Sequence, residues 1–457
     1  MAVPMRPRTR YQFTPAQVLV LGFGALILFG SLLLWLPITH EVGRSVSYID
    51  ALFISTSAVC VTGLVTVDLA TTFNLFGELV ILGLIQAGGL GIMTLSALML
   101  LLLGKRVTLK ERLLMQEALG SFSIAGVVRL TRNIIVTTLV IEGVAGLLLS
   151  LRWLLQYPWQ KAFYWGFWHT VSAFNNAGMD VTSENMRPFA RDPFVLAIIG
   201  GLIILGGIGF PVLQDVWRNR SWEKLTLHSR LSIKMTVILI LVGMALFLVG
   251  EWTNGRTFGG LPWYHKLSNA WFAAVTPRTA GFESVLSGSM REFSLLLTII
   301  LMFIGASPGG TGGGIKTTSF AMIIKSIQTI SSGQEEVTIM GRRIPKDLIE
   351  KAFVIASLAM LLCVAVSMAL LITERPMLAT PNSDHTGLDL IYEVVSAFGT
   401  VGLSTGLTPF LSVAGKVLIT LTMFIGRVGP LTMAVALAQR SLGRSPIHYP
   451  EDRVMIG

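Results

Sequence analysis

The sequence predicts an all-α polytopic membrane protein, and three observations support this fold class. The chain has 457 residues, of which 53% are hydrophobic and only 13% are charged. A soluble domain carries about 25% charged residues. The mean hydropathy is +0.69. Eight apolar segments approach or exceed the ~20 residues that cross a bilayer core, and none shows the alternation of a barrel strand. They are 18–36, 79–103, 134–155, 195–213, 233–249, 295–304 with 315–330, 348–372 and 413–438.

The distribution of charge supports a multi-pass membrane topology. The net charge is +10, which in a soluble protein would indicate nucleic acid as the partner. Here the basic residues lie in short segments between apolar runs, so we expect no nucleic-acid binding. Every second connecting segment is basic, which places those segments and both termini in the cytoplasm. The basic clusters are 6–10, 105–112, 218–234, 342–351 and 440–444.

A short sequence ending in glycine recurs four times, each time between a short and a long apolar segment. We refer to these as the glycine phrases, and three of them place glycine six residues after serine. The third begins at Ala273 and is two residues longer. The phrases are Ser57-Ala58-Val59-Cys60-Val61-Thr62-Gly63, Ser172-Ala173-Phe174-Asn175-Asn176-Ala177-Gly178, Ala273-Ala274-Val275-Thr276-Pro277-Arg278-Thr279-Ala280-Gly281 and Ser396-Ala397-Phe398-Gly399-Thr400-Val401-Gly402.

Each phrase follows an apolar stretch of about ten residues (49–59, 162–174, 267–275 and 388–398), too short to cross a bilayer. We expect four re-entrant half-helices, because irregular backbone at membrane depth is tolerated only inside protein or beside water. Four such segments satisfy one another best around a shared pore. The predicted architecture is four linked repeats, each a span, a half-helix and a span (M1–P–M2), arranged with pseudo-fourfold symmetry. The boundaries are 1–113, 114–222, 223–340 and 341–440, followed by a tail at 441–457.

The phrases predict a ring of backbone carbonyls that replaces the water around a cation. The negative end of each half-helix dipole would favour a cation at the centre, and glycine permits the positive φ that aligns carbonyls. Helix C-caps also favour glycine, which would explain one such phrase but not four in register. The predicted cation-binding residues are Cys60, Val61, Thr62, Gly63, Asn175, Asn176, Ala177, Gly178, Arg278, Thr279, Ala280, Gly281, Gly399, Thr400, Val401 and Gly402.

The sixth apolar segment is interrupted by a run that no continuous helix tolerates. A phosphate-binding loop is disfavoured because no strand precedes it. We expect a flexible intramembrane loop, followed by Lys316. The run is Gly305, Ala306, Ser307, Pro308, Gly309, Gly310, Thr311, Gly312, Gly313 and Gly314.

Charged residues inside apolar segments are functional candidates because they are costly there. Arg427 lies midway along the last segment, and the alternatives to a functional role are a structural ion pair or a side chain that snorkels from a helix end. Glu142 lies inside the third segment and is either a coupling carboxylate or a structural partner for a neighbouring helix. Arg278 cannot line a cation path, so we expect it to point away and brace its loop. No nucleophile–base pair or metal-ligand spacing is present in the sequence, so the chain is not expected to be an enzyme.

The four phrases and the interrupted segment resemble the Trk/Ktr/HKT superfamily of K+ transporters over nearly the whole chain. The resemblance points to the Ktr membrane subunits, because we expect 18–36 to be the first span of the first repeat, without the two extra N-terminal spans usual in Trk members. The resemblance implies K+ as the transported ion, since glycine at all four positions goes with K+ selectivity in the family. It also implies that residues 305–314 form a gating loop, with Lys316 after it and Arg427 facing it as an electrostatic barrier. Cys60 stands where the family usually has a small residue, and we expect its side chain to pack behind the filter.

The resemblance further implies partners and a location. Ktr membrane subunits form homodimers in the bacterial cell membrane, on a cytosolic KtrA- or KtrC-like ring that binds ATP, ADP or NAD. We therefore expect no cofactor in this chain itself. The docking candidates are the basic loops, residues 334–343 and the tail at 440–457. Dependence on Na+ is left open, and an H+-coupled Trk-type symporter is the alternative.

Overall fold

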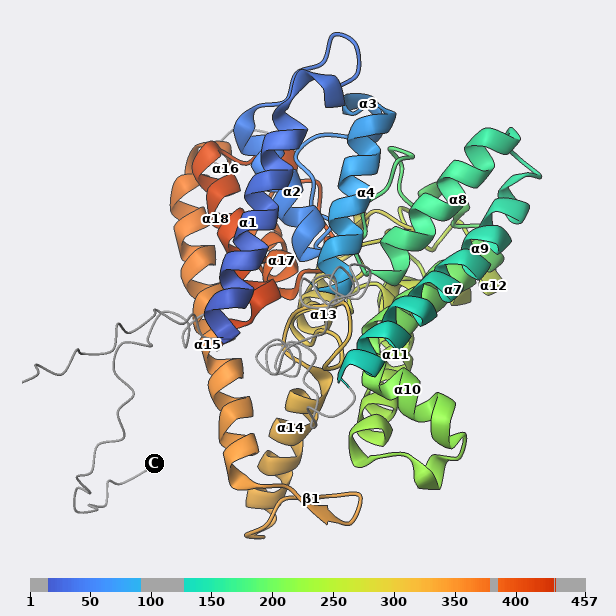
Figure 1. Cartoon of the computed structure of the whole chain (residues 1–457). Coiled ribbons are helices and arrows are strands. Elements are labelled where there is room, and N and C mark those ends of the chain that lie inside the picture. Colours follow the sequence, from blue (N-terminus) through green and yellow to red (C-terminus); the bar gives the residue numbers. More distant parts are fainter. Residues whose placement is uncertain (1–14, 92–126, 379–384, 431, 433–457) are drawn as a thin grey trace, which may run out of the picture.

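The computed structural model describes residues 15–91, 127–378, 385–430 and 432, and helices dominate this part of the chain (Figure 1). The structure departs from the expected all-α class in one small hairpin. In it, β1 (Thr338–Ile339) pairs antiparallel with β2 (Arg342–Arg343). Its turn is made by Met340 and Gly341, which have φ values of 49° and 75°. The basic clusters at 6–10, 105–112 and 440–444, the tail and the first repeat boundary lie outside the described residues.

Four long apolar helices each open one of the four predicted repeats. They are α1 (Pro15–Trp35), α7 (Val127–Trp153), α11 (Leu227–Glu251) and α15 (Lys346–Thr373). Among the described residues, these four helices are long and apolar enough to cross a membrane, and α9 with α10 would make a fifth span. The eight spans therefore stay a prediction for the remaining segments.

The second half of each predicted repeat is shorter or broken. The helices are α4 (Leu75–Leu90), α9 (Pro193–Gly207), α10 (Phe210–Asn219), α13 (Glu292–Phe303), α14 (Thr317–Ser331) and α18 (Val413–Val428). The break between α13 and α14 confirms the interruption expected at 305–314. The apolar segment expected at 195–213 is not one straight helix, because α9 and α10 meet at 96°. Gly209, with φ of 102°, and Pro211 in the first turn of α10 account for the bend.

The four short apolar stretches before the glycine phrases are confirmed as helices. They are α2 (Tyr48–Cys60), α8 (Trp159–Phe174), α12 (Trp263–Val275) and α17 (Gly387–Gly399). Each packs against the long helix that precedes it in the chain. The remaining helices are short connectors: α3 (Leu69–Thr72), α16 (Arg375–Leu378), and the 3₁₀ turns η1 (Pro37–Thr39), η2 (Arg187–Phe189), η3 (Trp222–Lys224), η4 (Ser287–Ser289) and η5 (Thr408–Phe410).

The two ends of the described chain share one hydrophobic core. Phe53 and Ile85 from the first repeat belong to the same buried cluster as Tyr392 and Met423 from the fourth. Helix α18 packs against α2, and Figure 1 shows these red and blue helices on the same side of the molecule. An ion pair joins them, with Lys416 Nζ 2.7 Å from Asp50 Oδ1 and both side chains 15% exposed. We refer to this contact as the closing seam, since no peptide connection crosses it.

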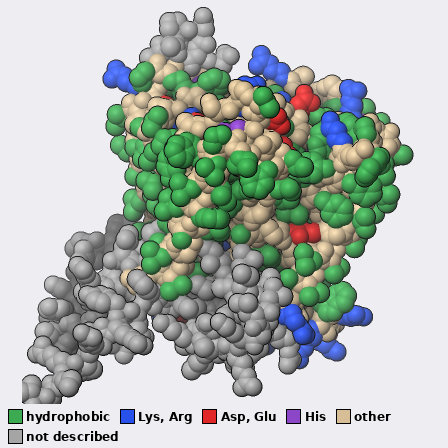
Figure 2. Space-filling view, turned by 45° about the horizontal axis from the view of Figure 1, so that its top comes forward, with side chains coloured by type: hydrophobic (Ala, Val, Ile, Leu, Met, Phe, Trp, Pro, Cys, Tyr) green, Lys and Arg blue, Asp and Glu red, His purple; other side chains and the backbone are tan. Residues whose placement is uncertain are grey.

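The outer surface is apolar in a broad band. Large side chains on the long helices are exposed, including Leu28, Leu147, Leu241 and Val364. Figure 2 shows hydrophobic side chains over the middle of one face, with Lys and Arg near its top and bottom. A surface of this kind is stable against lipid hydrocarbon rather than water, which agrees with a polytopic membrane protein.

Candidate functional site

The four glycine phrases adopt the same backbone conformation. In each, the residue two positions before the glycine has a positive φ: 58° at Val61, 59° at Asn176, 73° at Thr279 and 49° at Thr400. The glycines Gly63, Gly178, Gly281 and Gly402 have φ values of 100°, 65°, 74° and 91°. Between them lies a residue with negative φ. A backbone that alternates in this way turns successive carbonyls toward the same side, as a cation-coordinating ring requires.

The phrases contact one another in a closed cycle. A Cβ added to Gly63 would lie against the Ala177 carbonyl oxygen, and one added to Gly178 would lie against the Ala280 oxygen. A Cβ added to Gly281 would lie against the Val401 carbonyl oxygen, and one added to Gly402 would lie against the Thr62 oxygen. All four contacts would be closer than 3.0 Å, a separation that real Cβ atoms essentially never show. Each glycine is therefore required by both its φ and its neighbour.

A hydroxyl group anchors each phrase to its own helix. Ser57 Oγ accepts from Gly63 N and Ser396 Oγ accepts from Gly402 N, both at 3.0 Å. Ser172 Oγ donates to Met179 O and Thr276 Oγ1 donates to Phe282 O, both at 2.7 Å. Thr276 is thus the third anchor, five residues before its glycine. Counted from its anchoring hydroxyl to its glycine, the third phrase is one residue shorter than the other three. The sequence pattern had suggested that it is two residues longer.

A second set of glycines lets the neighbouring helices approach the phrases. Gly88 on α4, Gly206 on α9 and Gly426 on α18 face the carbonyls of Val59, Phe174 and Phe398, respectively. Each of these carbonyls lies four residues before the glycine of its phrase. Sequence reasoning missed these positions, although a glycine inside the apolar segment after each phrase was a signal that could have found them.

The loop at 305–314 lies against the phrases and α9. Ser307 N donates to Gly207 O at 2.9 Å, and Thr311 N donates to Gly206 O at 3.1 Å. Gly313 N donates to Thr400 Oγ1 at 3.0 Å, and Gly312 lies against the Thr279 side chain. The loop therefore contacts the third and fourth phrases directly.

Two buried or half-buried cations hold this loop through backbone carbonyls. Lys316 Nζ donates to Gly312 O at 2.6 Å. Arg427 donates from Nη1 to Thr311 O and from Nη2 to Gly88 O, so it connects the loop with α4. No carboxylate among the described residues forms an ion pair with either side chain. Among the described residues, their positive charge therefore has no carboxylate partner beside the phrases.

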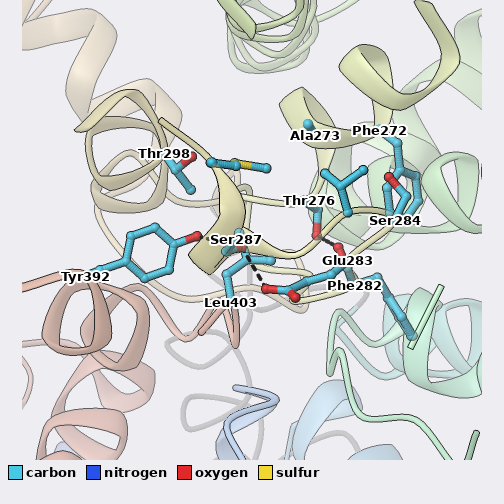
Figure 3. A pocket seen from close by; sticks show the side chains of 12 residues that line it. Phe272, Ala273, Thr276, Phe282, Glu283, Ser284, Ser287, Thr298, Tyr392 and Leu403 are labelled. Atoms are coloured by element: carbon cyan, nitrogen blue, oxygen red, sulfur yellow. Dashed lines mark hydrogen bonds between the residues drawn. The ribbon is translucent and has the colours of Figure 1, made fainter. Parts of the chain in front are cut away.

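A hydrogen-bonded group lies beside the third phrase, around a cavity of about 10 Å³ (Figure 3). Tyr392 OH donates to Ser287 Oγ at 3.1 Å, and Ser287 Oγ donates to Glu283 Oε1 at 2.7 Å. Ser404 N donates to the same carboxylate at 3.4 Å. Burial raises the pKa of the Glu283 carboxyl to about 7. Because Ser404 follows Gly402, this group links the third phrase with the fourth.

The other two predicted charged residues form hydrogen bonds with polar side chains of neighbouring segments. Arg278 Nη2 donates to Thr236 Oγ1 on α11 at 3.1 Å, so its head is directed to that helix. Glu142 on α7 accepts from Asn175 Nδ2 at 3.0 Å and from Gln86 Nε2 at 3.3 Å. Cys60 is fully buried. The structure thus brings all four phrases, the loop and Arg427 together at one place.

Apolar helices, a lipid-type surface and a ring of glycine-terminated loops define a polytopic membrane protein that transports cations. A family profile described as TrkH, a cation transport protein, matches residues 6–443. The chain belongs to this family, and so to the Trk/Ktr/HKT superfamily of transporters rather than to the enzymes.

Relatives match over nearly the full length. The chain is 43% identical to the Ktr system potassium uptake protein B of Bacillus subtilis, over 98% of this chain and 97% of that protein. It is 36% identical to the potassium/sodium uptake protein NtpJ of Enterococcus hirae, over 99% of both chains. The crystal structure of the potassium transporter TrkH from Vibrio parahaemolyticus has the same fold, with a TM-score of 0.74 and 18% sequence identity. That likeness covers 95% of this chain and 87% of the other.

Proposed function

We propose that the chain is the K+-translocating subunit of a bacterial Ktr-type uptake system. The closed cycle of contacts among Gly63, Gly178, Gly281 and Gly402 is the observation that carries the proposal. It supports four M1–P–M2 repeats around a pseudo-fourfold pore, with boundaries at 1–113, 114–222, 223–340 and 341–440. The names of the similar proteins, which refer to potassium uptake, support K+ as the cargo.

In this proposal the phrases select K+ through backbone oxygens. The ion exchanges its water shell for carbonyls of Cys60–Gly63, Asn175–Gly178, Arg278–Gly281 and Gly399–Gly402. Carbonyls held at fixed positions lower the cost of dehydration for an ion that fits them. The buried ends of α2, α8, α12 and α17 add partial negative charge around the same point.

The loop at 305–314 and Arg427 act as the gate. The loop contacts Thr279 and Thr400 of two phrases, and Arg427 attaches it to α4. With the loop in this position, the positive heads of Lys316 and Arg427 repel a cation that leaves the filter. Flow requires the loop to move and those hydrogen bonds to break.

In this proposal the chain lies in the bacterial cell membrane and binds two kinds of partner. We propose a homodimer with cytoplasmic termini, bound to a KtrA- or KtrC-like ring that carries ATP, ADP or NAD. The hairpin of β1 and β2 within residues 334–343 is an exposed docking candidate, with Arg342 and Arg343 on one strand. Stimulation by Na+ is part of the same proposal.

The test is K+ uptake by cells that lack their own K+ uptake systems. Cells that express the chain together with a ring subunit should grow and take up K+ at low external K+, and cells with the chain alone should do so less. No uptake with both proteins present at the membrane would overturn the proposal. Uptake that follows the proton gradient instead would identify a Trk-type H+-coupled symporter.

A further inference from the structure

Glu142 is a buried carboxylate in the apolar middle of α7. The residue is 5% exposed, and no Lys, Arg or His among the described residues pairs with it. A charge at this depth is expensive and is retained mainly where it has a function. The neighbours of this carboxylate therefore indicate what it binds.

Two amide side chains from different repeats surround the carboxylate. Asn175 Nδ2 lies 3.0 Å from Glu142 Oε1, 2.8 Å from Gln86 Oε1 and 2.9 Å from Val171 O. Three acceptors thus converge on one nitrogen that has only two hydrogens. At the same time Asn175 Oδ1 is fully buried and has no hydrogen-bond partner. The group has too many oxygens and too few donors.

Two other buried carboxylates of the described chain, Glu393 and Glu251, accept more hydrogen bonds than Glu142 does. Glu393 accepts from Ser404 Oγ, Thr405 N and Thr408 Oγ1. Glu251 accepts from Thr257 Oγ1, Asn254 Nδ2 and Arg291 N. Glu142 receives only the two amide nitrogens, and one of them is shared with two other oxygens. A missing positive charge explains this difference.

We propose that Glu142, Gln86 and Asn175 form a Na+ site separate from the carbonyl filter. The amide of Asn175 turns over, so that Oδ1 takes the place of Nδ2 and faces the Glu142 and Gln86 oxygens around the ion. The ligands are then all oxygens, which suit a hard cation. The single carboxylate matches one positive charge, which favours a monovalent ion over Mg²⁺ or Ca²⁺.

The position of Asn175 gives the site its effect on transport. Asn175 caps α8 and is the first predicted filter residue of the second phrase. Gln86 lies on α4, two residues before Gly88, whose carbonyl accepts from Arg427. A bound ion therefore orients the second phrase and fixes the part of α4 that holds the gate.

The inference rests on the proposed K+ uptake, and the test separates the two. K+ uptake by the chain with its ring subunit is measured at fixed K+ while NaCl replaces choline chloride. The wild type should be stimulated by Na+. Glu142→Gln and Gln86→Leu should each raise the Na+ concentration for half-maximal stimulation at least tenfold, and Glu142→Asp should recover part of the response. Glu41→Gln removes an exposed carboxylate outside the basic clusters and should leave the response unchanged.

The purified full chain provides a second measurement that does not depend on transport. Exchange of choline for Na+ should raise the unfolding temperature of the wild type and of Glu41→Gln, but not that of Glu142→Gln. Normal K+ uptake without any Na+ response, or an unchanged response in Glu142→Gln, would overturn the Na+ site alone. Stimulation by protons in place of Na+ would overturn it as well. Absence of K+ uptake in the wild type would instead overturn the proposed function.

Discussion

Gly63 shows how a single residue of the glycine phrases meets two structural requirements. Its φ of 100° lies where side chains are strained, and the space on its Cβ side is occupied by the Ala177 oxygen. Any substituent must therefore distort the first phrase, displace the second or do both. Because the four phrases touch in a cycle, the disturbance reaches more than one carbonyl.

We predict that Gly63→Ser weakens the preference for K+ over Na+ and lowers K+ uptake. The strain in backbone conformation alone costs about 1–3 kcal/mol. Uptake of K+ in competition with Na+ measures the effect. Gly24→Ala is the matched control, since nothing lies within 4 Å of its Cβ position. An unchanged preference for K+ in Gly63→Ser would count against the filter.

Glu283 allows a prediction about pH. Its pKa is raised by burial from 4.5 to about 7, so the folded protein binds the proton more tightly than the unfolded chain does. This group therefore favours folding at low pH, and its contribution is lost as the pH rises from about 4.5 to about 7. In Glu283→Gln this loss is absent.

The unfolding temperature of Glu283→Gln, minus that of the wild type, should increase between pH 5 and pH 7.5. The glutamine oxygen still accepts from Ser287 and Ser404, so hydrogen bonding to the fourth phrase is retained. Thermal unfolding of both proteins across this pH range is the measurement. A difference that stays constant with pH would show that Glu283 does not titrate there.

At the scale of elements, helices α4, α9 and α18 share one packing arrangement. Each places a glycine against a carbonyl at the end of a neighbouring short helix, so that the helix backbones approach without a side chain between them. This close approach fixes the depth of each phrase relative to the helix beside it. The glycines are thus part of the support for the carbonyl ring.

We predict that Gly88→Ala destabilises the protein and reduces K+ uptake. Its Cβ would meet the backbone of Val59, which cannot move aside without shifting α2. Overpacking of this kind costs about 1–3 kcal/mol. Gly83→Ala on the same helix is the control, because nothing lies within 4 Å of its Cβ position. Equal unfolding temperatures and uptake rates for the two variants would contradict this role.

The loop between α13 and α14 carries its own prediction. Deletion of Gly309 and Gly310 removes the hydrogen bond from Phe210 N to Gly309 O and shortens the reach to Thr400. Flux of K+ through liposomes should rise, and Arg427→Gln, which detaches the loop from α4, should have the same effect. Arg132→Gln removes an exposed arginine and serves as the control. An equal or lower flux in the deletion variant would rule out the gating role.

For the whole molecule, the closing seam holds the first and fourth repeats together without a covalent link. The Lys416–Asp50 pair is 15% exposed on both sides, unlike the Lys351–Asp347 pair, whose side chains are 63% and 64% exposed. On α4 the residue at the same distance from the helix N-cap is Glu78, which accepts a hydrogen bond from Tyr164 on α8. At the same distance from the helix N-cap, a polar contact therefore joins the fourth repeat to the first and the first repeat to the second.

We predict a coupling free energy of about 1.5–3 kcal/mol between Lys416 and Asp50. It is measured by a double-mutant cycle with Lys416→Met and Asp50→Asn on the stability of the folded protein. The same cycle on Lys351 and Asp347 should give a value close to zero, as is usual for exposed pairs. Additive effects at Lys416 and Asp50 would show that the ion pair does not close the ring.

Much of the fold could be predicted from sequence because apolar length and repetition are local signals. The four short helices, the break before α14 and the membrane-spanning lengths of four helices all followed from them. The 96° bend after α9 did not, because it depends on Gly209 and Pro211 within a run that reads as continuously apolar. The β1–β2 hairpin is too short to leave a periodic pattern.

Parts of the candidate site could also be predicted from the sequence, and other parts could not. The phrase glycines were predictable because glycine alone adopts positive φ at low cost. The positive φ values of Val61 and Thr400 were not, since neither residue prefers them and only the packing around the helix ends imposes them. The contacts of Arg427 with Thr311 and Gly88 also depend on three distant segments meeting. Such information is absent from any one stretch of sequence.

The closed cycle of four phrases within one polypeptide has a genetic consequence. In a tetramer of identical subunits, one codon change alters the ring at four points, and mixed alleles assemble into hybrid rings. Here each codon change alters a single quarter, and translation fixes the stoichiometry of the ring. A mutation can therefore change one quarter of the ring and leave the other three unchanged. The product of a defective allele does not enter the rings made from a normal allele.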